Sequence, residues 1–428
     1  MRLNIPQNLN RIIEKLENAG FSAYLVGGCV RDFLLGKVPH DYDVATDALP
    51  EQTTDVLKDY TVIPTGIKHG TVSVIAGGKQ YEITTFRREG AYSDRRRPDT
   101  VSFDATLADD LSRRDLTINA LAYSPREGVI DLFGGIAHLN AKIITCVGKP
   151  DERFGEDALR ILRAIRFASV LGFEIEEETK QSIIKNAPAL QSISAERIRD
   201  ELLSLISGEN CKKQLIEFQN VFEYVLPAIE IYGKTHTPSL PADVWQHTAE
   251  VVENCPNDKT LRLAALLCNA ALFYPKPDGR EDTARQVMNG LKFDNKTKAA
   301  VLPLVAYHNA KISAETPAVL RMFNIIEKDG FYNLLTLQTA MARTSSDHTR
   351  LTHLEKVKEV ADEAGAKNLP YRISHLAVDG SILLAAGIPR GRKTGEILSD
   401  ILENVISGRI SNTKEDIMSY VRMKFINE

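Results

Sequence analysis

Two carboxylates one residue apart are the first candidates for chemistry in this sequence. The stretch Asp41-Tyr42-Asp43-Val44 alternates charged and apolar side chains. Because side chains on a strand point alternately to its two faces, the two aspartates would share one face. Like charges side by side repel each other unless a cation joins them, and oxygen ligands of this kind suit Mg²⁺ completed by water and phosphate oxygens. A pair of this kind can also be incidental, so the neighbouring motifs decide whether the two aspartates form a metal site.

A glycine pair upstream predicts a phosphate-binding turn. Gly27-Gly28 lies between a short apolar stretch over 22–26, which predicts a strand, and a helical pattern over 29–35. Backbone N–H groups at a strand-to-helix turn can receive phosphate oxygens, and Arg31 would add a cation one turn into the helix. The plainer interpretations are a tight turn and a surface ion pair between Arg31 and Asp32.

The two stretches together resemble a known family. GGCVRDFLLG followed by HDYDVAT resembles the first motif of the DNA polymerase β-like nucleotidyltransferase superfamily, in the branch that holds tRNA nucleotidyltransferases (CCA-adding enzymes, class II) and bacterial poly(A) polymerases. Later motifs of that branch follow in order over about 180 residues. They are RRDLTINALAY at 113–123, DLFGG at 131–135, RFGEDALRILRAIRF at 153–167 and SAERIRDEL at 194–202.

The resemblance implies Mg²⁺-dependent transfer of C, C and A from CTP and ATP to the 3′-hydroxyl of tRNA, with release of pyrophosphate. Asp41 and Asp43 would hold the metal, and Glu82 would be a third catalytic carboxylate on a neighbouring strand. In the bland interpretation Glu82 is the polar face of a hairpin, and the Arg113-Arg114 pair is simply solvated. The residues that the resemblance assigns to the phosphates and the sugar are Gly27, Gly28, Arg31, Arg114 and Asp115.

The resemblance also implies a protein template for the incoming base. Asp157 and Arg160 are three residues apart, which would place them on one face of a continuous helix, and Arg163 and Arg166 continue the spacing. The family interpretation makes Asp157 and Arg160 read the base, with Arg163 and Arg166 also binding nucleotide. The alternative is a ladder of ion pairs within the helix, including Glu156 with Arg160.

Base chemistry agrees with such a template. Cytosine and adenine both present an amino donor beside a ring-nitrogen acceptor, whereas uracil and guanine present the reversed pattern. A carboxylate acceptor beside a guanidinium donor therefore suits CTP and ATP. Each unpaired buried group costs about 1–3 kcal/mol, so two mismatches would discriminate against UTP and GTP on the order of a hundredfold.

Composition narrows the class further. The 428 residues carry 53 Lys and Arg against 57 Asp and Glu, a formal net charge of −4, which excludes a globally basic protein that coats nucleic acid. The sequence predicts no signal peptide and no membrane segment. Its five cysteines are scattered and form no Cys-x-x-Cys pair, which predicts reduced thiols and a cytoplasmic location. No obligate protein partner is evident.

The elements that must position these residues begin with an α/β region. We expect a helix over 8–18, strands over 22–26 and 41–45, and a hairpin of 71–76 with 80–86 around two glycines. From Gly155 onward the apolar spacing becomes helical. The predicted fold is an α/β polymerase β-like head followed by an all-α neck, body and tail. The expected bounds are 1–145 for the catalytic head, 146–208 for the neck that binds base and RNA, 209–300 for the body and 301–428 for a tRNA-binding tail.

The body resembles an HD-type metal hydrolase that has lost its ligands. His247 matches one ligand position, but Cys268 and Asn269 stand where the His-Asp pair would be. We therefore expect a degenerate HD-like scaffold without phosphohydrolase activity.

A charged segment over 87–99 resembles the family's flexible loop, which the A-adding step requires. Its presence favours full CCA addition or A addition. The remaining alternatives are an A-adding enzyme, a poly(A) polymerase, an HD-type phosphohydrolase and a catalytically dead RNA-binding protein.

Overall fold

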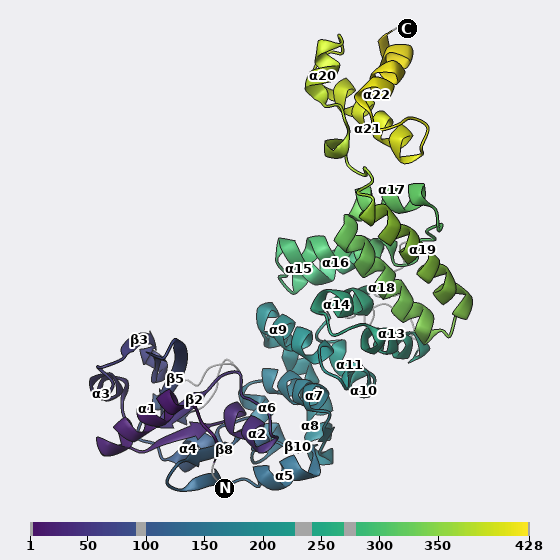
Figure 1. Ribbon diagram of the computed structural model, residues 1–428. Coiled ribbons are helices and arrows are strands. Elements are labelled where there is room, and N and C mark those ends of the chain that lie inside the picture. Colours follow the sequence, from purple (N-terminus) through teal and green to yellow (C-terminus); the bar gives the residue numbers. More distant parts are fainter. Residues whose placement is uncertain (1–2, 91–99, 227–241, 269–279, 427–428) are drawn as a thin grey trace. The chain divides into compact units, whose positions relative to one another are not determined.

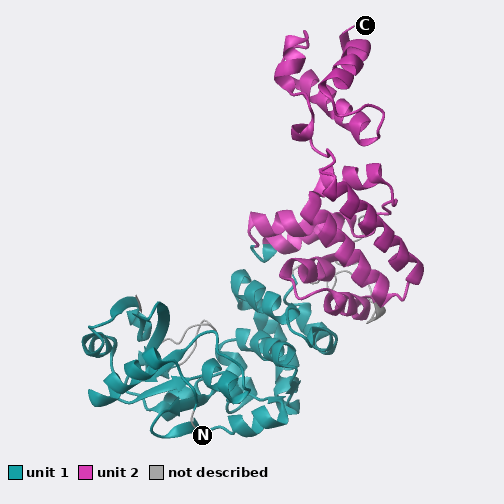
Figure 2. Cartoon of the chain, viewed as in Figure 1, with its two compact units in different colours: residues 1–237, 290–292 teal, residues 238–289, 293–428 magenta. Residues whose placement is uncertain are grey.

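The computed structural model describes residues 3–90, 100–226, 242–268 and 280–426 (Figure 1). The chain divides into two compact units (Figure 2). Unit 1 comprises Met1–Thr237 with Gly290–Lys292, and unit 2 comprises Pro238–Asn289 with Phe293–Glu428. Unit 1 contains a mixed sheet, whereas unit 2 is helical throughout its described residues. The predicted order of an α/β head followed by an all-helical remainder is thus confirmed.

A seven-stranded sheet with the order β3-β4-β5-β2-β1-β8-β9 forms the centre of the head. Neighbouring strands are antiparallel except β2 and β5, which are parallel. That parallel pair aligns Asp43 with Glu82. The strands are β1 (Ala23–Val26), β2 (Asp43–Thr46), β3 (Thr61–Gly66), β4 (Thr71–Ala76), β5 (Lys79–Thr85), β8 (Leu121–Ser124) and β9 (Gly128–Asp131).

The predicted hairpin is confirmed as β4 and β5, and Gly77 and Gly78 turn the chain with φ of 59° and 75°. The strand predicted over 41–45 is only partly right, because β2 begins at Asp43 and Asp41 precedes it. The predicted alternation still holds across this boundary. Tyr42 and Val44 are buried, whereas Asp41 and Asp43 are exposed.

Short helices cover the sheet and complete the head. The helix predicted over 8–18 is confirmed as α1 (Gln7–Asn18), whose apolar face is buried as its spacing requires. The segment 91–99, most of the predicted flexible loop, lies outside the described residues. The other elements are α2 (Gly28–Leu34), α3 (Pro50–Val56), η1 (Ile67–His69), α4 (Leu107–Ser112), η2 (Thr117–Asn119), α5 (Gly135–Ala141) and the paired β6 (Arg88–Glu89) and β7 (Val101–Ser102).

The rest of unit 1 is built on α7 (Leu159–Leu171), which packs against α9 (Ala195–Ile206). The buried residues of α9 are Ile198, Leu202, Leu205 and Ile206, which recur at the spacing that the sequence predicts. The remaining elements are β10 (Ile143–Ile144), α6 (Pro150–Glu156), β11 (Glu174–Ile175), α8 (Glu177–Asn186), η3 (Ala187–Ser192), α10 (Cys211–Glu217) and α11 (Gln219–Phe222).

The continuous helix expected from Gly155 to Arg166 is wrong. The chain leaves the helical conformation at Asp157, where φ is −142° and ψ is 104°, so α6 ends and α7 begins around it. The carboxylate of Asp157 accepts the backbone N–H of Leu159 at 3.0 Å. Short polar side chains compete with the helix for backbone hydrogen bonds in this way, which favours a break.

Unit 2 contains ten described α-helices. In the body, Cys268 is buried at the end of α14, and Asn269 lies outside the described residues. The helices are α13 (Ala242–Asn254), α14 (Lys259–Cys268), α15 (Arg280–Gly290), α16 (Asn295–Tyr307), α17 (Thr316–Ile326), α18 (Lys328–Thr344), α19 (His348–Ala366), α20 (Gly380–Ala385), α21 (Arg392–Ile406) and α22 (Lys414–Val421), with η5 (Ile373–His375) and η6 (Arg422–Ile426) as short turns.

The last three of these helices share a core of their own, which includes Val378, Leu383, Ile401 and Val421. Within the described ranges, none of the helices combines the length and apolar character needed to span a membrane.

The packing of α5 against η2 yields a stability prediction. A Cβ placed on Gly135 would lie 2.3 Å from the carbonyl oxygen of Thr117. Gly135→Ala should therefore lower the free energy of unfolding by about 1–3 kcal/mol through overpacking. Thermal unfolding followed by circular dichroism would measure the loss as a lower Tm.

The matched control is Gly155→Ala, because Gly155 is exposed within α6 and a Cβ there meets no atom within 4 Å. Alanine at this helical position should raise stability by about 0.5–1 kcal/mol. Equal melting temperatures for the two variants would contradict the packing argument.

Candidate functional site

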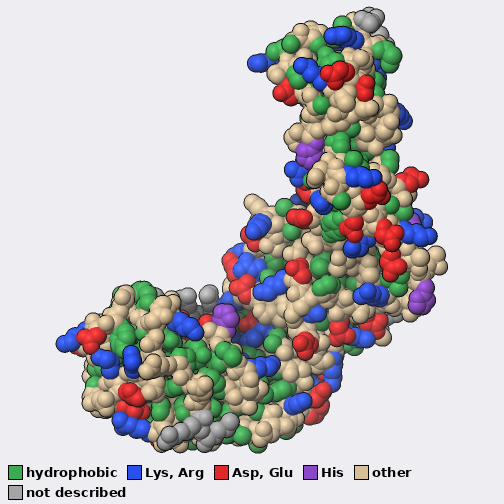
Figure 3. All heavy atoms as spheres, viewed as in Figure 1, with side chains coloured by type: hydrophobic (Ala, Val, Ile, Leu, Met, Phe, Trp, Pro, Cys, Tyr) green, Lys and Arg blue, Asp and Glu red, His purple; other side chains and the backbone are tan. Residues whose placement is uncertain are grey.

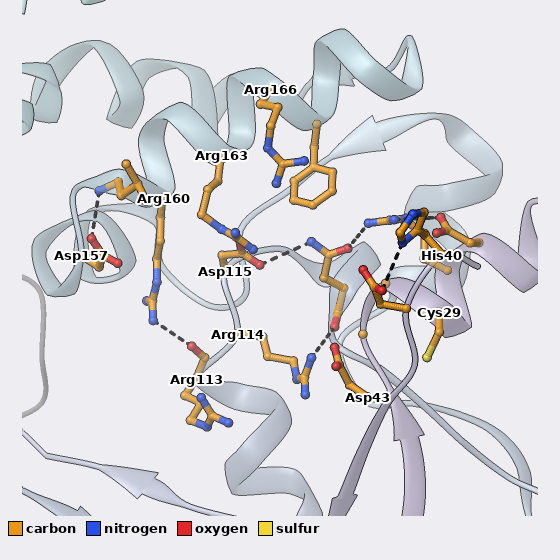
Figure 4. Close-up of a pocket in the computed structure, with 18 of the residues that line it drawn as sticks. Cys29, His40, Asp43, Arg113, Arg114, Asp115, Asp157, Arg160, Arg163 and Arg166 are labelled. Atoms are coloured by element: carbon orange, nitrogen blue, oxygen red, sulfur yellow. Dashed lines mark hydrogen bonds and ion pairs between the residues drawn. The ribbon is translucent and has the colours of Figure 1, made fainter. Parts of the chain in front are cut away.

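A cavity of about 750 Å³ in unit 1 gathers the predicted site residues (Figure 4). Its wall contains seven arginines and five aspartates, a composition that suits a polyanionic ligand. Every residue predicted for the site lies in it except Glu82. The lining residues are Gly27, Gly28, Cys29, Arg31, Asp32, His40, Asp41, Asp43, Arg113, Arg114, Asp115, Asn119, Asp157, Leu159, Arg160, Arg163, Arg166, Phe167 and Arg197.

The carboxylates lie at one side of this cavity. Asp43 starts β2 beside Glu82 of β5, and Asp41 precedes it with its carboxylate 3.1 Å from Nδ1 of His40. Although Asp43 is exposed at its edge, the surrounding protein displaces water from around its carboxylate and raises its pKa above the usual range. Arg114 opposes the shift, and the charges of Glu82 and Asp41 add to it. A carboxylate anion disfavoured in this way gains from a nearby cation.

The donor set fits a divalent metal, because it consists of exposed carboxylate oxygens. Within the described ranges, no three His, Cys, Asp or Glu side chains are already gathered closely enough to hold an ion. Asp41 and Asp43 are therefore the residues that would hold it, with the remaining ligands supplied by substrate and water.

The glycine turn lies directly beside the guanidinium group of Arg114. Gly27 has a φ of 77°, which favours glycine, and a Cβ there would lie 2.6 Å from Nη1 of Arg114. Its N–H donates to the carbonyl of Leu121 at 3.0 Å. The N–H of Gly27 is thus engaged within the protein, and the turn would offer a phosphate the N–H groups that follow it in α2.

Asn119 joins the two arginines predicted to bind phosphate. Arg31 donates from Nη1 to the Asn119 side chain at 2.7 Å, and Arg114 donates from Nη1 to the Asn119 carbonyl at 3.3 Å. Arg31 also pairs with Asp32 at 2.8 Å, as the plainer interpretation expected. The Nε of Arg114 is buried and has no hydrogen-bond partner among the described residues.

Asp115 lies beside Arg163 in the cavity wall (Figure 4). It accepts from Nε of Arg163 at 2.5 Å and from the N–H of Leu116 at 2.9 Å. Burial alone would raise the pKa of Asp115, but the charge and hydrogen bond of Arg163, with the charge of Arg160, lower it to about 2. Asp115 therefore stays ionised and fixes Arg163. Its carboxylate then has fewer acceptor positions left for a sugar hydroxyl.

Asp157 and Arg160 do not form a pair on one helical face. Asp157 is bound by Arg197 of α9, with Nη2 at 2.6 Å from Oδ2. Arg160 pairs with Glu156 across the break and donates from Nη2 to the carbonyl of Arg113 at 3.0 Å (Figure 4). Each member of the predicted template thus has its own partner, while both still line the same cavity.

Four residues of the site were missed by the sequence reasoning, although each lies in a motif that it quoted. Asn119 comes from RRDLTINALAY, Phe167 from RFGEDALRILRAIRF, and Arg197 and Glu201 from SAERIRDEL. Glu201 accepts from Nε of Arg166 at 2.6 Å. Their side chains act through other residues, so a search for chemically reactive groups passes over them.

Charge on the face drawn in Figure 3 is mixed. On the face shown in Figure 3, Lys and Arg side chains are interspersed with Asp and Glu over both units, in keeping with the net charge of −4. The concentration of arginines in the cavity is therefore a local feature.

Comparisons with known proteins give the class. Residues 23–145 match the poly A polymerase head domain family, 172–232 match a probable RNA- and SrmB-binding site of polymerase A, and 269–421 match domain 2 of tRNA nucleotidyltransferase. These matches identify a nucleotidyltransferase of the poly A polymerase type, as the sequence motifs predicted.

Individual relatives narrow this class. The chain is 50% identical over 422 residues to a CCA-adding enzyme of Ligilactobacillus salivarius and 36% identical over 414 residues to one of Lactobacillus delbrueckii subsp. bulgaricus, in both cases over 96% of each protein. The structure of Bacillus stearothermophilus CCA-adding enzyme in complex with CTP has a TM-score of 0.77, 29% identity and 99% coverage of both chains. The chain belongs to the CCA-adding enzyme family. Nucleotidyltransferases of this kind generally use a divalent metal.

The Asp115–Arg163 ion pair yields a pH prediction. Because folding lowers the pKa of Asp115 from 3.8 to about 2, its contribution to stability, about 2 kcal/mol, is present above pH 4 and lost as the pH falls toward 2. Asp115→Asn should therefore melt below the wild type at pH 7, and the difference should shrink between pH 4 and pH 2. The exposed Asp55→Asn on α3 is the control for loss of one negative charge. A difference that is constant with pH would refute the ion-pair explanation.

Proposed function

We propose that this protein adds C, C and A in turn to the 3′ end of tRNA, using CTP and ATP and releasing pyrophosphate. The observation that carries the proposal is the single cavity in which Asp41 and Asp43 face a group of arginines. The named relatives, which share 36% and 50% identity over 96% of the chain, support this substrate choice.

The carboxylates would perform the metal-dependent part of the transfer. Asp41 and Asp43 would hold Mg²⁺, whose preference for oxygen ligands they satisfy, and Glu82 would help orient the attacking 3′-hydroxyl. When bound there, the metal supplies a lowered pKa for that hydroxyl and neutralises charge on the leaving pyrophosphate. The raised pKa of Asp43 supports this assignment, because a site of crowded negative charge favours a cation.

Arginines on the other side of the cavity would bind the nucleotide. Arg31 and Arg114 would take the phosphates, helped by N–H groups at the start of α2. Arg114 is well suited because it approaches the turn across Gly27 and keeps a buried Nε without a protein partner among the described residues. Arg163 and Arg166 lie further along the same wall.

Base selection would rest on Asp157 and Arg160. Arg197 would orient Asp157, and Glu156 would orient Arg160, because each binds one of the pair. Neither partner occupies all the hydrogen-bonding positions of the residue that it binds, so positions remain for a base. An acceptor and a donor held side by side suit cytosine and adenine, whereas uracil and guanine would leave both protein groups unpaired.

The helical remainder would bind tRNA by its shape and backbone rather than by its sequence. We retain the division into head, neck, body and tail as the proposed division of this work. Because Cys268 stands at one of the expected ligand positions, we assign the body no hydrolase activity. We also propose a cytoplasmic location, where tRNA and nucleotides are available and the buried cysteine thiols would stay reduced.

Replacing one metal-binding carboxylate tests the catalytic assignment. Asp41→Asn should reduce CMP transfer by roughly 10³-fold or more, because one anionic ligand contributes several kcal/mol to transition-state stabilisation. Affinity for tRNA, measured by filter binding, should stay near that of the wild type. The exposed Asp59→Asn, which loses the same charge at the Lys15 ion pair, should transfer at the wild-type rate. Parallel loss of tRNA binding in Asp41→Asn would point to misfolding and contradict a specific catalytic role.

Primer extension tests the reaction itself. The protein would be incubated with Mg²⁺ and tRNA that ends before CCA, tRNA that ends in CC, or an unstructured RNA, each with one or more of the four nucleotides. We expect the first tRNA to gain CCA and then stop, with UTP and GTP used on the order of a hundredfold less well.

Other products would replace the proposal by a specific alternative. Activity confined to tRNA ending in CC would indicate an A-adding enzyme, and long A tracts on any RNA would indicate a poly(A) polymerase. No transfer to any primer would reject the catalytic account.

A further inference from the structure

One aromatic ring in the cavity wall lies among three arginines. Phe167 of α7 is only 8% exposed. The guanidinium carbon lies 3.8 Å from the ring centroid for Arg166, 5.0 Å for Arg31 and 5.7 Å for Arg163. Each distance is within the range in which a cation is attracted to the electron-rich face of an aromatic ring.

Each of these arginines is also held by a polar partner from elsewhere in unit 1. Arg31 donates to Asn119 at 2.7 Å, Arg163 to Asp115 at 2.5 Å and Arg166 to Glu201 at 2.6 Å. Such hydrogen bonds lie in the plane of the guanidinium group and leave its flat faces without a polar partner. The ring of Phe167 is a surface on which those faces can lie.

The arrangement brings three like charges together in a part of the wall where Arg31 is buried and Arg163 is partly exposed. Arg31 is 9% exposed, and burial with the nearby charge of Arg163 lowers the pKa of Arg166 despite its pairing with Glu201. Glu201 is not among the residues that line the cavity, whereas all three arginines are. The cavity therefore presents three cationic groups whose repulsion must be offset, and an aliphatic side chain in place of the ring would offset none of it.

We propose that Phe167 is a positioning residue that holds Arg31, Arg163 and Arg166 together as one binding surface for the polyphosphate of the incoming nucleotide. This inference rests on the proposed function and adds to it. The ring contacts all three arginines, and through Arg31 it links α2, which follows the glycine turn, to α7, which carries Arg160. A polyphosphate that binds the three guanidinium groups would add negative charge to that of their partners Asp32, Asp115 and Glu201.

Fluorination of the ring separates this role from simple packing. Phenylalanine with one, two or three ring fluorines keeps nearly the same shape, but each fluorine withdraws electron density from the ring face and weakens its attraction for cations. The full-length protein would carry each analogue at position 167. Dissociation constants for CTP and for inorganic tripolyphosphate would be measured by calorimetry with Mg²⁺ present.

We expect affinity for both ligands to fall stepwise with the number of fluorines, reaching a loss of roughly tenfold for trifluorophenylalanine. The KM for CTP should rise by a similar factor. The control series is at Phe154, which is buried in α6 and has no cation over its ring among the described residues. Those analogues should bind both ligands as the wild type does.

Several results would overturn the inference. One is a constant affinity along the series at position 167, and another is an equal loss along the series at Phe154. Weakened binding of CTP without weakened binding of tripolyphosphate would reject the polyphosphate as the ligand. Phe167→Leu is a second variant, and its affinity should fall at least as far as that of the trifluorinated protein.

The same experiment keeps the two proposals apart. If the wild type transfers CMP to tRNA but fluorination has no effect on binding, only the role of Phe167 fails. If the wild type neither binds CTP nor transfers it, the proposed function fails, and the role of Phe167 fails with it.

Discussion

Repulsion among seven arginines around one cavity is the constraint on which the rest of the site depends. Guanidinium groups keep their charge when buried, so each must be given a counter-charge, a hydrogen-bond acceptor or an aromatic face. The acceptors come from different elements. Asn119 of η2 serves Arg31, and Glu201 of α9 serves Arg166. The site can therefore form only after these elements have packed together. Asn119 and Glu201 lie in the quoted motifs for this reason, although neither belongs to the predicted set of site residues.

The break at Asp157 has a comparable consequence for the side chains of Asp157 and Arg160. Had α6 and α7 been one helix, Asp157 and Arg160 would have been neighbours able to neutralise each other. In the extended conformation at Asp157, the carboxylate binds Arg197 of α9 instead. Both groups thus line the cavity as charged, oriented side chains. The proposed template depends on Asp157 and Arg160 not binding each other, because a donor and an acceptor engaged with each other would have fewer positions left for a base.

Sequence reasoning reached the α/β head, the hairpin and the clustering of most site residues, because alternation along β2 and glycine turns are local properties. It could not reach the partners of those residues. The helix break escaped it because the spacing of Asp157 and Arg160 suits a helix, and only the competing hydrogen bond to Leu159 shows otherwise. Arg197 escaped it because its contact with Asp157 spans 40 positions of the chain. Such long-range pairings depend on tertiary packing, which periodicity does not encode.

Two adjacent residues connect the halves of the cavity. Arg114 reaches toward Asp43 and the glycine turn, and its charge opposes the rise in the pKa of Asp43. Asp115 turns the other way and binds Arg163 of α7. The two side chains come from consecutive backbone positions and reach opposite groups of the cavity wall. The Arg-Asp pair of the RRDLTINALAY motif thus joins the surroundings of Asp43 to Arg163 of α7 through two consecutive backbone positions.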